Sequence, residues 1–92
     1  MYQIQPYSYS QASKLEVKIT PSKKATKKID VYDRLGKFIC SVGAKGYSDY
    51  PTYLKTRGQV YADERRRLYK MRHQYNRHKV GSAGYYADNL LW

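Results

Sequence analysis

Four basic side chains are spaced so that they could bind phosphate or another anion along one face of a helix. They recur at intervals of four, three and four residues: Arg66, Lys70, His73 and Arg77. An α-helix turns by about 100° per residue, so these intervals bring the four side chains to one face. Arg holds phosphate through two parallel hydrogen bonds, and Lys holds it as a point charge. We call this set the basic ladder; Arg65 and Arg67 flank it on either side.

The opposite face of the same segment is apolar. Between residues 59 and 77 it collects Val60, Tyr61, Leu68, Met71 and Tyr75. We therefore predict one long amphipathic helix over 59–77 that packs its apolar face on a small core and presents the basic ladder to an anionic partner. The alternative is a cationic face that is merely solvated. Arg65 and Arg72 lie nearer the apolar face, where their stems can instead cover core residues.

A lysine-rich loop offers a second set of phosphate contacts. Residues 21–28 have no apolar periodicity, and four lysines fall within six of them: Lys23, Lys24, Lys27 and Lys28. Such a run is typical of a phosphate-binding loop and equally of a solvated one, so both interpretations stay open.

Segments in which polar and apolar residues alternate predict the sheet that these basic elements must pack around. Residues 28–33 and 37–42 alternate, and Gly36 between them supplies the positive φ of a hairpin turn. Residues 16–20 also alternate and predict a third strand, which Pro21 ends. Alternation places Ile29, Val31, Phe38 and Cys40 on one face as the candidate core face, but the apolar residues Tyr32, Ile39 and Val42 leave the choice of face open.

The predicted fold class is therefore α+β. A β-hairpin, or a three-stranded antiparallel sheet, packs against one long basic amphipathic helix, and a short helical turn follows over 85–92. Residues 16–92 form a single small domain, and residues 1–15 form a Tyr-rich arm before it. We expect the arm to start extended, because Pro6 disfavours helix at the residue before it, and to hold a short helix over 11–15.

The two ends of the chain supply candidate docking residues. The Leu-Leu-Trp segment either folds back to close the core or forms an apolar tail that docks on a neighbouring subunit. The Tyr-rich arm offers rings that could join such a contact. The partner-docking set is thus Tyr2, Tyr7, Tyr9, Leu90, Leu91 and Trp92.

Composition favours a polyanionic partner. The chain has 18 Lys and Arg against 7 Asp and Glu, a net charge of +11, and such an excess repels itself unless anions neutralise it. No segment has a base-reading pattern, so we expect phosphate contacts, little sequence specificity and an affinity that falls steeply with salt. The 12 Tyr suit stacking on unpaired bases, although core filling is the better explanation for Tyr61, Tyr75, Tyr85 and Tyr86.

The sequence contains no arrangement typical of catalysis or metal binding. Cys40 is the single cysteine, so no disulfide can form within the chain. His73 and His78 are five residues apart and fall on different faces of a helix, which does not suit a zinc site. Residues 43–46 lack the spacing of a P-loop, no apolar run spans a membrane, and no signal peptide is present. We therefore expect a protein that is not an enzyme, not secreted and not in the membrane, with no metal and no cofactor.

Three short motifs occur in a fixed order. They are Gly-Ala-Lys-Gly-Tyr-Ser-Asp-Tyr at 43–50, Arg-Arg-Arg-Leu-Tyr-Lys-Met-Arg-His at 65–73 and Ala-Gly-Tyr-Tyr-Ala-Asp-Asn-Leu-Leu-Trp at 83–92. Together they resemble a group of small basic proteins of giant eukaryotic DNA viruses and some tailed phages, over roughly residues 28–92. That family carries no settled activity and brings no catalytic residues with it. The resemblance implies a viral origin, and small basic viral proteins commonly coat packaged DNA or act as minor capsid or cement proteins.

From these observations we predict a non-enzymatic viral protein that binds nucleic acid, DNA rather than RNA, with little sequence specificity. It would act in the virion, or in the cytoplasm or viral factory of the host cell. The basic ladder, its two flanking arginines and the lysine-rich loop would make the contacts. The alternative is a minor capsid or cement protein whose basic face and Tyr-rich arm dock on acidic capsid subunits. A remote third function is to modulate a host nucleic-acid-processing protein.

Overall fold

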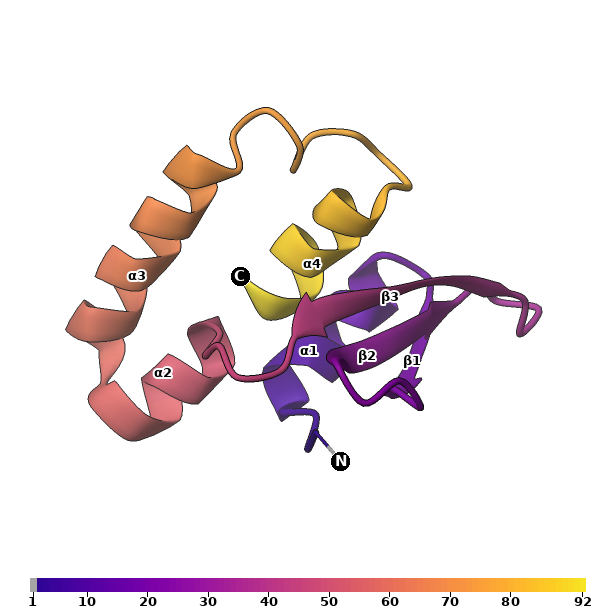
Figure 1. The fold of residues 1–92 in the computed structure, drawn as a ribbon, viewed down its shortest axis with the longest axis horizontal. Helices are drawn as coiled ribbons and strands as arrows, with labels where there is room; N and C mark the ends of the chain where they lie inside the picture. Colours follow the sequence, from indigo (N-terminus) through magenta and orange to yellow (C-terminus); the bar gives the residue numbers. More distant parts are fainter. Residues whose placement is uncertain (1) are drawn as a thin grey trace.

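A computed structural model describes residues 2–92 as an α+β fold (Figure 1). The strands form one antiparallel sheet in the order β1-β2-β3. The predicted class, the hairpin and the third strand are therefore confirmed. Along the chain the elements are α1 (Pro6–Lys14), β1 (Lys18–Pro21), β2 (Lys27–Tyr32), β3 (Phe38–Ala44), α2 (Tyr50–Arg57), α3 (Gln59–Arg72) and α4 (Ala83–Leu91).

Local turn chemistry explains the hairpin between β2 and β3. Gly36 has a φ of 87°, a conformation that other residues rarely adopt. The Asp33 carboxylate accepts hydrogen bonds from the amides of Leu35 and Lys37, each at 2.9 Å. An aspartate that bonds to the backbone just ahead of it is a common way to close a turn. These contacts set the register of the two strands.

Phe38 departs from the predicted core face of this hairpin. Ile29 and Val31 are fully buried, but Phe38 is 49% exposed. The pairing shifts between Val31 and Tyr32, so that Tyr32 lies opposite Phe38. A β-bulge of this kind redirects the side chains that follow it. The prediction is therefore wrong for Phe38, whereas Cys40, opposite Val31, does pack against the core.

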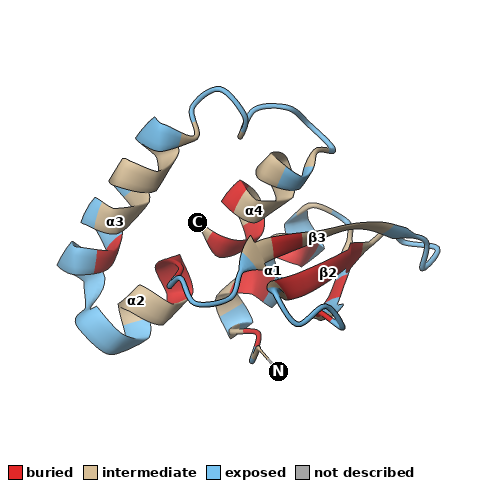
Figure 2. Ribbon diagram, viewed as in Figure 1, coloured by how far each residue is buried: buried red, intermediate tan, exposed pale blue. Residues whose placement is uncertain are grey.

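The core lies between the sheet and the two helices α1 and α4 (Figure 2). α1 packs on α4 and β1, and α4 packs on β3. Leu90 and Leu91 are buried at its centre, so the prediction that the Leu-Leu-Trp segment closes the core is confirmed. The buried apolar residues are Ile4, Ala12, Ile19, Ile29, Val31, Val42, Leu90 and Leu91.

The N-terminal segment forms a longer helix than predicted. Gln5 is extended, as expected before a proline, but α1 begins directly at Pro6 and continues to Lys14. Proline suits the first helical position because a backbone N–H there would have no partner within the helix, so its absence costs nothing. Ser8 is fully buried and donates to the carbonyl oxygen of Leu90 at 2.6 Å. The extended arm is therefore wrong for residues 6–10, where docking on α4 stabilises a helix, whereas residues 2–5 are not helical.

The basic helix is shorter than predicted and packs elsewhere. α3 begins at Gln59 but ends at Arg72, where His73 leaves helical geometry with a φ of −108° and a ψ of 18°. It packs mainly on α2, with which it forms the pair at the left of Figure 1. The sheet is covered by α1 and α4 instead. One long basic helix against the hairpin is therefore not found.

The predicted faces of α3 are also reversed. Val60 and Met71, expected in the core, are 86% and 63% exposed, while Ala62 is fully buried. Tyr75 lies beyond the helix and is 88% exposed, and Tyr61 is 40% exposed. Core filling by these two tyrosines was thus a wrong prediction. The reason is that the inner face of α3 is occupied by the basic ladder.

Candidate functional site

Arg66 of the basic ladder points inward and binds α2. Its Nη2 donates to the hydroxyl oxygen of Tyr50 at 2.8 Å, and its guanidinium centre lies 3.8 Å from the centroid of the Tyr50 ring. Asp63 lies 3.6 Å from the same Nη2 and accepts a hydrogen bond from the Tyr50 hydroxyl at 2.9 Å. A cation over an aromatic face is attracted by the ring quadrupole. Arg66 therefore joins α3 to α2, and 34% of its side chain stays exposed.

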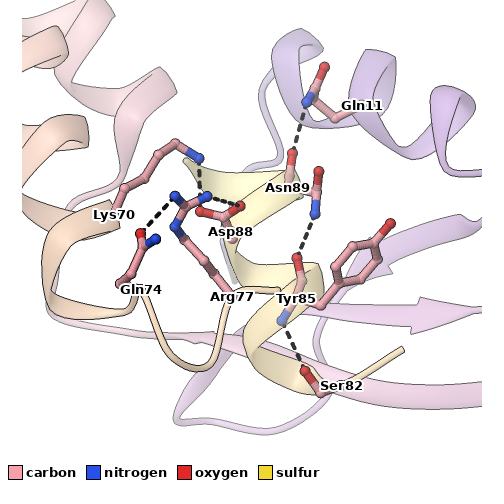
Figure 3. Close-up of polar contacts among 8 residues, drawn as sticks. All are labelled: Gln11, Lys70, Gln74, Arg77, Ser82, Tyr85, Asp88 and Asn89. Atoms are coloured by element: carbon pink, nitrogen blue, oxygen red, sulfur yellow. Dashed lines mark hydrogen bonds and ion pairs between the residues drawn. The ribbon is translucent and has the colours of Figure 1, made fainter. Parts of the chain in front are cut away.

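Two further members of the basic ladder share one buried carboxylate (Figure 3). Lys70 Nζ lies 2.8 Å from Asp88 Oδ1, and Arg77 Nη1 lies 4.0 Å from Asp88 Oδ2. Asp88 is only 6% exposed, so its charge requires partners of this kind. Arg77 also donates to the side-chain oxygen of Gln74 at 2.9 Å. Both cations therefore hold the end of α3 and the following turn on α4.

Lys28 of the lysine-rich loop is likewise an internal residue. It lies in the central strand β2, is 5% exposed and pairs with Asp49 at 2.9 Å. Its ammonium group also donates to the carbonyl oxygen of Tyr47. Tyr2 donates to the same Asp49 oxygen at 2.7 Å, and burial together with this carboxylate raises the pKa of Tyr2. Lys28 is therefore a structural residue, which corrects its predicted role as a phosphate contact.

The other predicted phosphate contacts differ in exposure. Lys23 and Lys24 are exposed in the turn between β1 and β2, and Lys27 is half-buried. Arg67 is exposed on the outer side of α3 but pairs with Glu64 at 2.6 Å. The lysine-rich loop therefore keeps three lysines that a ligand could reach.

Most of the predicted docking residues contribute to the fold itself. Leu90 and Leu91 are buried, so they cannot dock on a partner as an exposed tail. Tyr7 is half-buried against Tyr50, with ring centroids 5.5 Å apart. Tyr9 is 49% exposed and is the most accessible member of the set. The remaining two, Tyr2 and Trp92, are half-buried.

An aromatic cleft of about 650 Å³ lies between β3, α2, α3 and α4. The rings of Trp92 and Tyr69 are stacked in it, with centroids 4.3 Å apart and planes 7° from parallel. Tyr53 lies 6.2 Å from Trp92, and the exposed ring of Tyr47 lines the opening as well. Ala87 of α4 adds apolar surface, and the buried side chain of Leu91 lies behind it. Pockets that bind small ligands or cofactors commonly measure about 300–1,000 Å³ and are largely apolar, so this cleft could hold one.

The wall that α3 contributes to the aromatic cleft is cationic. Arg65, Arg72 and His73 all line it, and the Arg65 guanidinium lies 5.7 Å from the Tyr53 ring. Within residues 2–92, neither Arg65 nor Arg72 forms an ion pair, and no acidic side chain lines the cleft. The cleft therefore has a positive potential that would attract an anion.

Tyr69 contributes a polar group as well as a ring to this wall. Burial, with a further contribution from the negative charge of Asp88, raises the pKa of Tyr69 above its ordinary value of 10.0. Its phenol is therefore protonated at neutral pH and can donate a hydrogen bond. His73 packs beside it, with ring centroids 4.3 Å apart. The cleft thus combines aromatic faces, hydrogen-bond donors and positive charge.

The strand register brings the lysine-rich loop to the same end of the sheet as the aromatic cleft. Lys27 lies opposite Ala44, which lines the cleft, and the Lys45 amide donates to the carbonyl oxygen of Thr26 at 3.0 Å. A second hollow of about 440 Å³ shares Tyr47 with the cleft and includes Lys45. A bound chain could therefore pass from one basic region to the other.

Gly43 allows β3 and α4 to approach closely beside the aromatic cleft. Its φ is 79°, and a Cβ atom built there would lie 2.6 Å from Leu91 Cδ1 and 3.1 Å from Lys28 Cδ. Any side chain would push α4 away from the sheet. The absence of a side chain at Gly43 is therefore what permits this close approach.

The sequence predicted the cationic site on the helix face that begins at Arg66, whereas the aromatic cleft is lined by the neighbouring face that begins at Arg65. Only His73 belongs to both the basic ladder and the cleft, and Arg65 was expected only as a flanking residue. Tyr53, Tyr69 and Arg72 were not predicted as site residues. A signal for them exists, because Arg65, Tyr69, Arg72 and His73 recur at intervals of four, three and one residues, which also defines one helix face.

Comparisons of the chain with protein-family models, with curated proteins and with solved structures each found no match. The resemblance to small basic viral proteins thus stays a prediction. Among the described residues, no group of histidine, cysteine and acidic side chains could hold a metal ion. No helix among them is both long enough and apolar enough to cross a membrane.

Proposed function

We propose that the protein is non-enzymatic and binds nucleic acid through phosphate contacts with little sequence specificity. The observation that carries this proposal is the pair Arg65 and Arg72, two arginines on the wall of an aromatic cleft that have no acidic partner among residues 2–92. Guanidinium groups match the geometry of phosphate oxygens, and aromatic rings match the faces of bases. A role within a virus particle is supported by the resemblance of the three sequence motifs alone.

The distribution of ion pairs supports the same proposal. Six of the 18 Lys and Arg side chains pair with an acid, which leaves twelve without such a partner among residues 2–92. Three of the paired cations, Arg66, Lys70 and Arg77, belong to the basic ladder. The charge available to a ligand therefore lies elsewhere, and among the unpaired cations Arg65 and Arg72 line the aromatic cleft while Lys45 lines the second hollow.

A binding experiment with a charge-neutralised variant tests this function. We would measure fluorescence anisotropy of labelled duplex and single-stranded oligonucleotides of about 25 nucleotides, at low and at physiological salt. The proposal expects binding that salt weakens, and a loss of about tenfold in affinity for R65Q/R72Q. The matched control is K14Q/K37Q, which removes two exposed charges from α1 and the hairpin turn and should change affinity less. No binding at low salt by protein that circular dichroism shows to be folded would contradict the proposal.

A second candidate function, as a minor capsid or cement protein, is favoured by the outer face of α3 and the turn after it. Val60, Met71 and Tyr75 are 86%, 63% and 88% exposed there. Large exposed apolar side chains often mark a protein–protein contact. This candidate would use that surface, because the Leu-Leu segment predicted to dock is buried in the core. Retained association with capsid subunits in V60S/M71S would contradict it.

A further inference from the structure

We infer that the aromatic cleft receives an unpaired base, so that the protein prefers single-stranded to double-stranded nucleic acid. This inference rests on the proposed function and adds the class of ligand. It concerns the cleft between β3, α2, α3 and α4, where rings and arginines line one hollow.

The rings are already positioned before any ligand binds. Trp92 and Tyr69 are stacked within 7° of parallel, and Tyr53 lies near both Trp92 and the Arg65 guanidinium. Each ring is held by its neighbours, so little side-chain freedom is lost when a base enters. Trp92 and His73 already pack against the Tyr69 ring, so an entering base would contact the Trp92, Tyr53 or Tyr47 rings, and every base has a face that can do so. The cleft therefore suits bases without distinguishing strongly among them.

The arginines stand where the phosphates of an inserted nucleotide would be. Arg65 and Arg72 are seven residues apart in α3, which corresponds to about 10 Å along the helix axis. Two cations at this separation can contact the phosphates on either side of one nucleotide while its base lies between them. Their lack of acidic partners within residues 2–92 leaves both guanidinium groups available.

Duplex nucleic acid cannot use the cleft in this way. Bases in a duplex are stacked on each other and paired, so reaching the rings would require flipping a nucleotide out at an energetic cost. The apolar side chain of Ala87 and the aromatic rings line the cleft, and a sugar-phosphate backbone offers them no matching surface. An acidic peptide would satisfy the arginines but would leave the rings without a partner. Single-stranded nucleic acid satisfies both sets of residues.

Trp92 provides a direct measurement, because it is the single tryptophan of the chain and lies in the cleft. We would titrate the full chain with oligothymidylate of about 20 nucleotides, with a duplex of equal length, and with polyglutamate, at one salt concentration. We expect oligothymidylate to quench Trp92 emission saturably and to bind about tenfold more tightly than the duplex. Duplex and polyglutamate should leave the emission unchanged.

R72Q and K14Q provide the variant and its control. Arg72 is exposed and has no ion pair within residues 2–92, so R72Q should keep the fold. It should weaken oligothymidylate binding more than K14Q does. Equal affinity for the single strand and the duplex with unchanged Trp92 emission would overturn the inference but leave the proposed function standing. Equal quenching by polyglutamate would assign the cleft to an acidic peptide. No binding of any nucleic acid by the folded chain would overturn the proposed function as well.

Discussion

The ammonium group of Lys70 lies 2.8 Å from the carboxylate of Asp88, and this contact joins α3 to α4 across 18 residues of sequence. It turns Lys70 of the basic ladder toward α4, and 31% of the Lys70 side chain stays exposed. The neighbouring face of α3, which carries Arg65 and Arg72, lines the aromatic cleft. Lys70 is therefore paired, whereas Arg65 and Arg72 have no acidic partner within residues 2–92.

Replacing Asp88 by Asn should destabilise the protein. Lys70 and Arg77 would lose their shared acidic partner while they remain partly buried. We expect a loss of about 1–3 kcal/mol in the free energy of unfolding, measured by urea denaturation, because Lys70 is still partly solvated. E64Q is the matched control, since it breaks the exposed Glu64–Arg67 pair with the same change of charge. Equal stabilities of the two variants would contradict the structural role of Asp88.

Removing the Asp49 carboxylate should have a larger effect. Asp49 caps α2 by accepting from the Thr52 amide at 3.0 Å, and it neutralises buried Lys28. D49A would leave a buried ammonium group without its partner, so we expect a loss of about 3–5 kcal/mol. The double variant K28M/D49A should be more stable than the sum of the single effects predicts, because no unpaired charge remains. Additive effects in the urea denaturation of all three variants would argue against the pair.

The acid sensitivity of the fold should depend on Asp30. Burial alone would raise the pKa of its carboxyl group, but hydrogen bonds from Ser22, Ser41 and the Lys23 amide outweigh it and lower the pKa below 3.8. The folded state then binds fewer protons than the unfolded state, so this stabilisation is complete above the unfolded pKa and is lost as pH falls through the folded one.

A carbon-detected NMR titration of Asp30 measures this pKa directly. We expect a midpoint below 3.8 in the native chain and a higher midpoint in S41A, which removes a hydrogen bond at 2.6 Å. S13A, at an exposed serine of α1, is the control and should leave the midpoint unchanged. An identical midpoint in S41A and the native chain would show that Ser41 does not hold the carboxylate.

Alanine at Gly43 should be poorly tolerated. The new methyl group would meet Leu91 Cδ1 at 2.6 Å, and the residue would have to keep a φ of 79°. We expect a loss of about 1–3 kcal/mol in thermal unfolding measurements, from the strained backbone and the displaced α4 together. G46A separates backbone strain from the steric clash, because Gly46 also has a positive φ, 94°, but nothing lies within 4 Å of a Cβ built there. G43A should therefore be less stable than G46A, and the opposite order would mean that α4 does not press on β3.

The sheet could be predicted because its signals are local. Alternation of residue types and a glycine at position 36 define strands and turn within about fifteen residues, and the structure confirms them. The burial of Leu90 and Leu91 was also predictable, since such side chains are rarely left in water. The shift at Tyr32 was not predictable, because a β-bulge depends on contacts on both faces of the sheet.

Periodicity could not predict which face of α3 packs against the rest of the protein. Its pattern shows two faces but not which one is buried, and apolar content favoured the face of Val60 and Met71. The orientation of α3 depends on partners elsewhere in the chain, because Arg66 packs on Tyr50 and Lys70 pairs with Asp88. The aromatic cleft was missed for the same reason, since it combines residues from five elements: β2, β3, α2, α3 and α4. Local patterns therefore predicted the elements better than the site.

The salt dependence of binding tests the location of the phosphate contacts most directly. We would plot the logarithm of the association constant for a single-stranded oligonucleotide against the logarithm of salt concentration for the native chain, R65Q/R72Q and K14Q/K37Q. Each lost phosphate contact lowers the magnitude of the slope by about 0.7 on single strands. We predict that R65Q/R72Q reduces it by about 1.4 and that K14Q/K37Q leaves it nearly unchanged. The same slope for R65Q/R72Q as for the native chain would show that Arg65 and Arg72 do not contact phosphate.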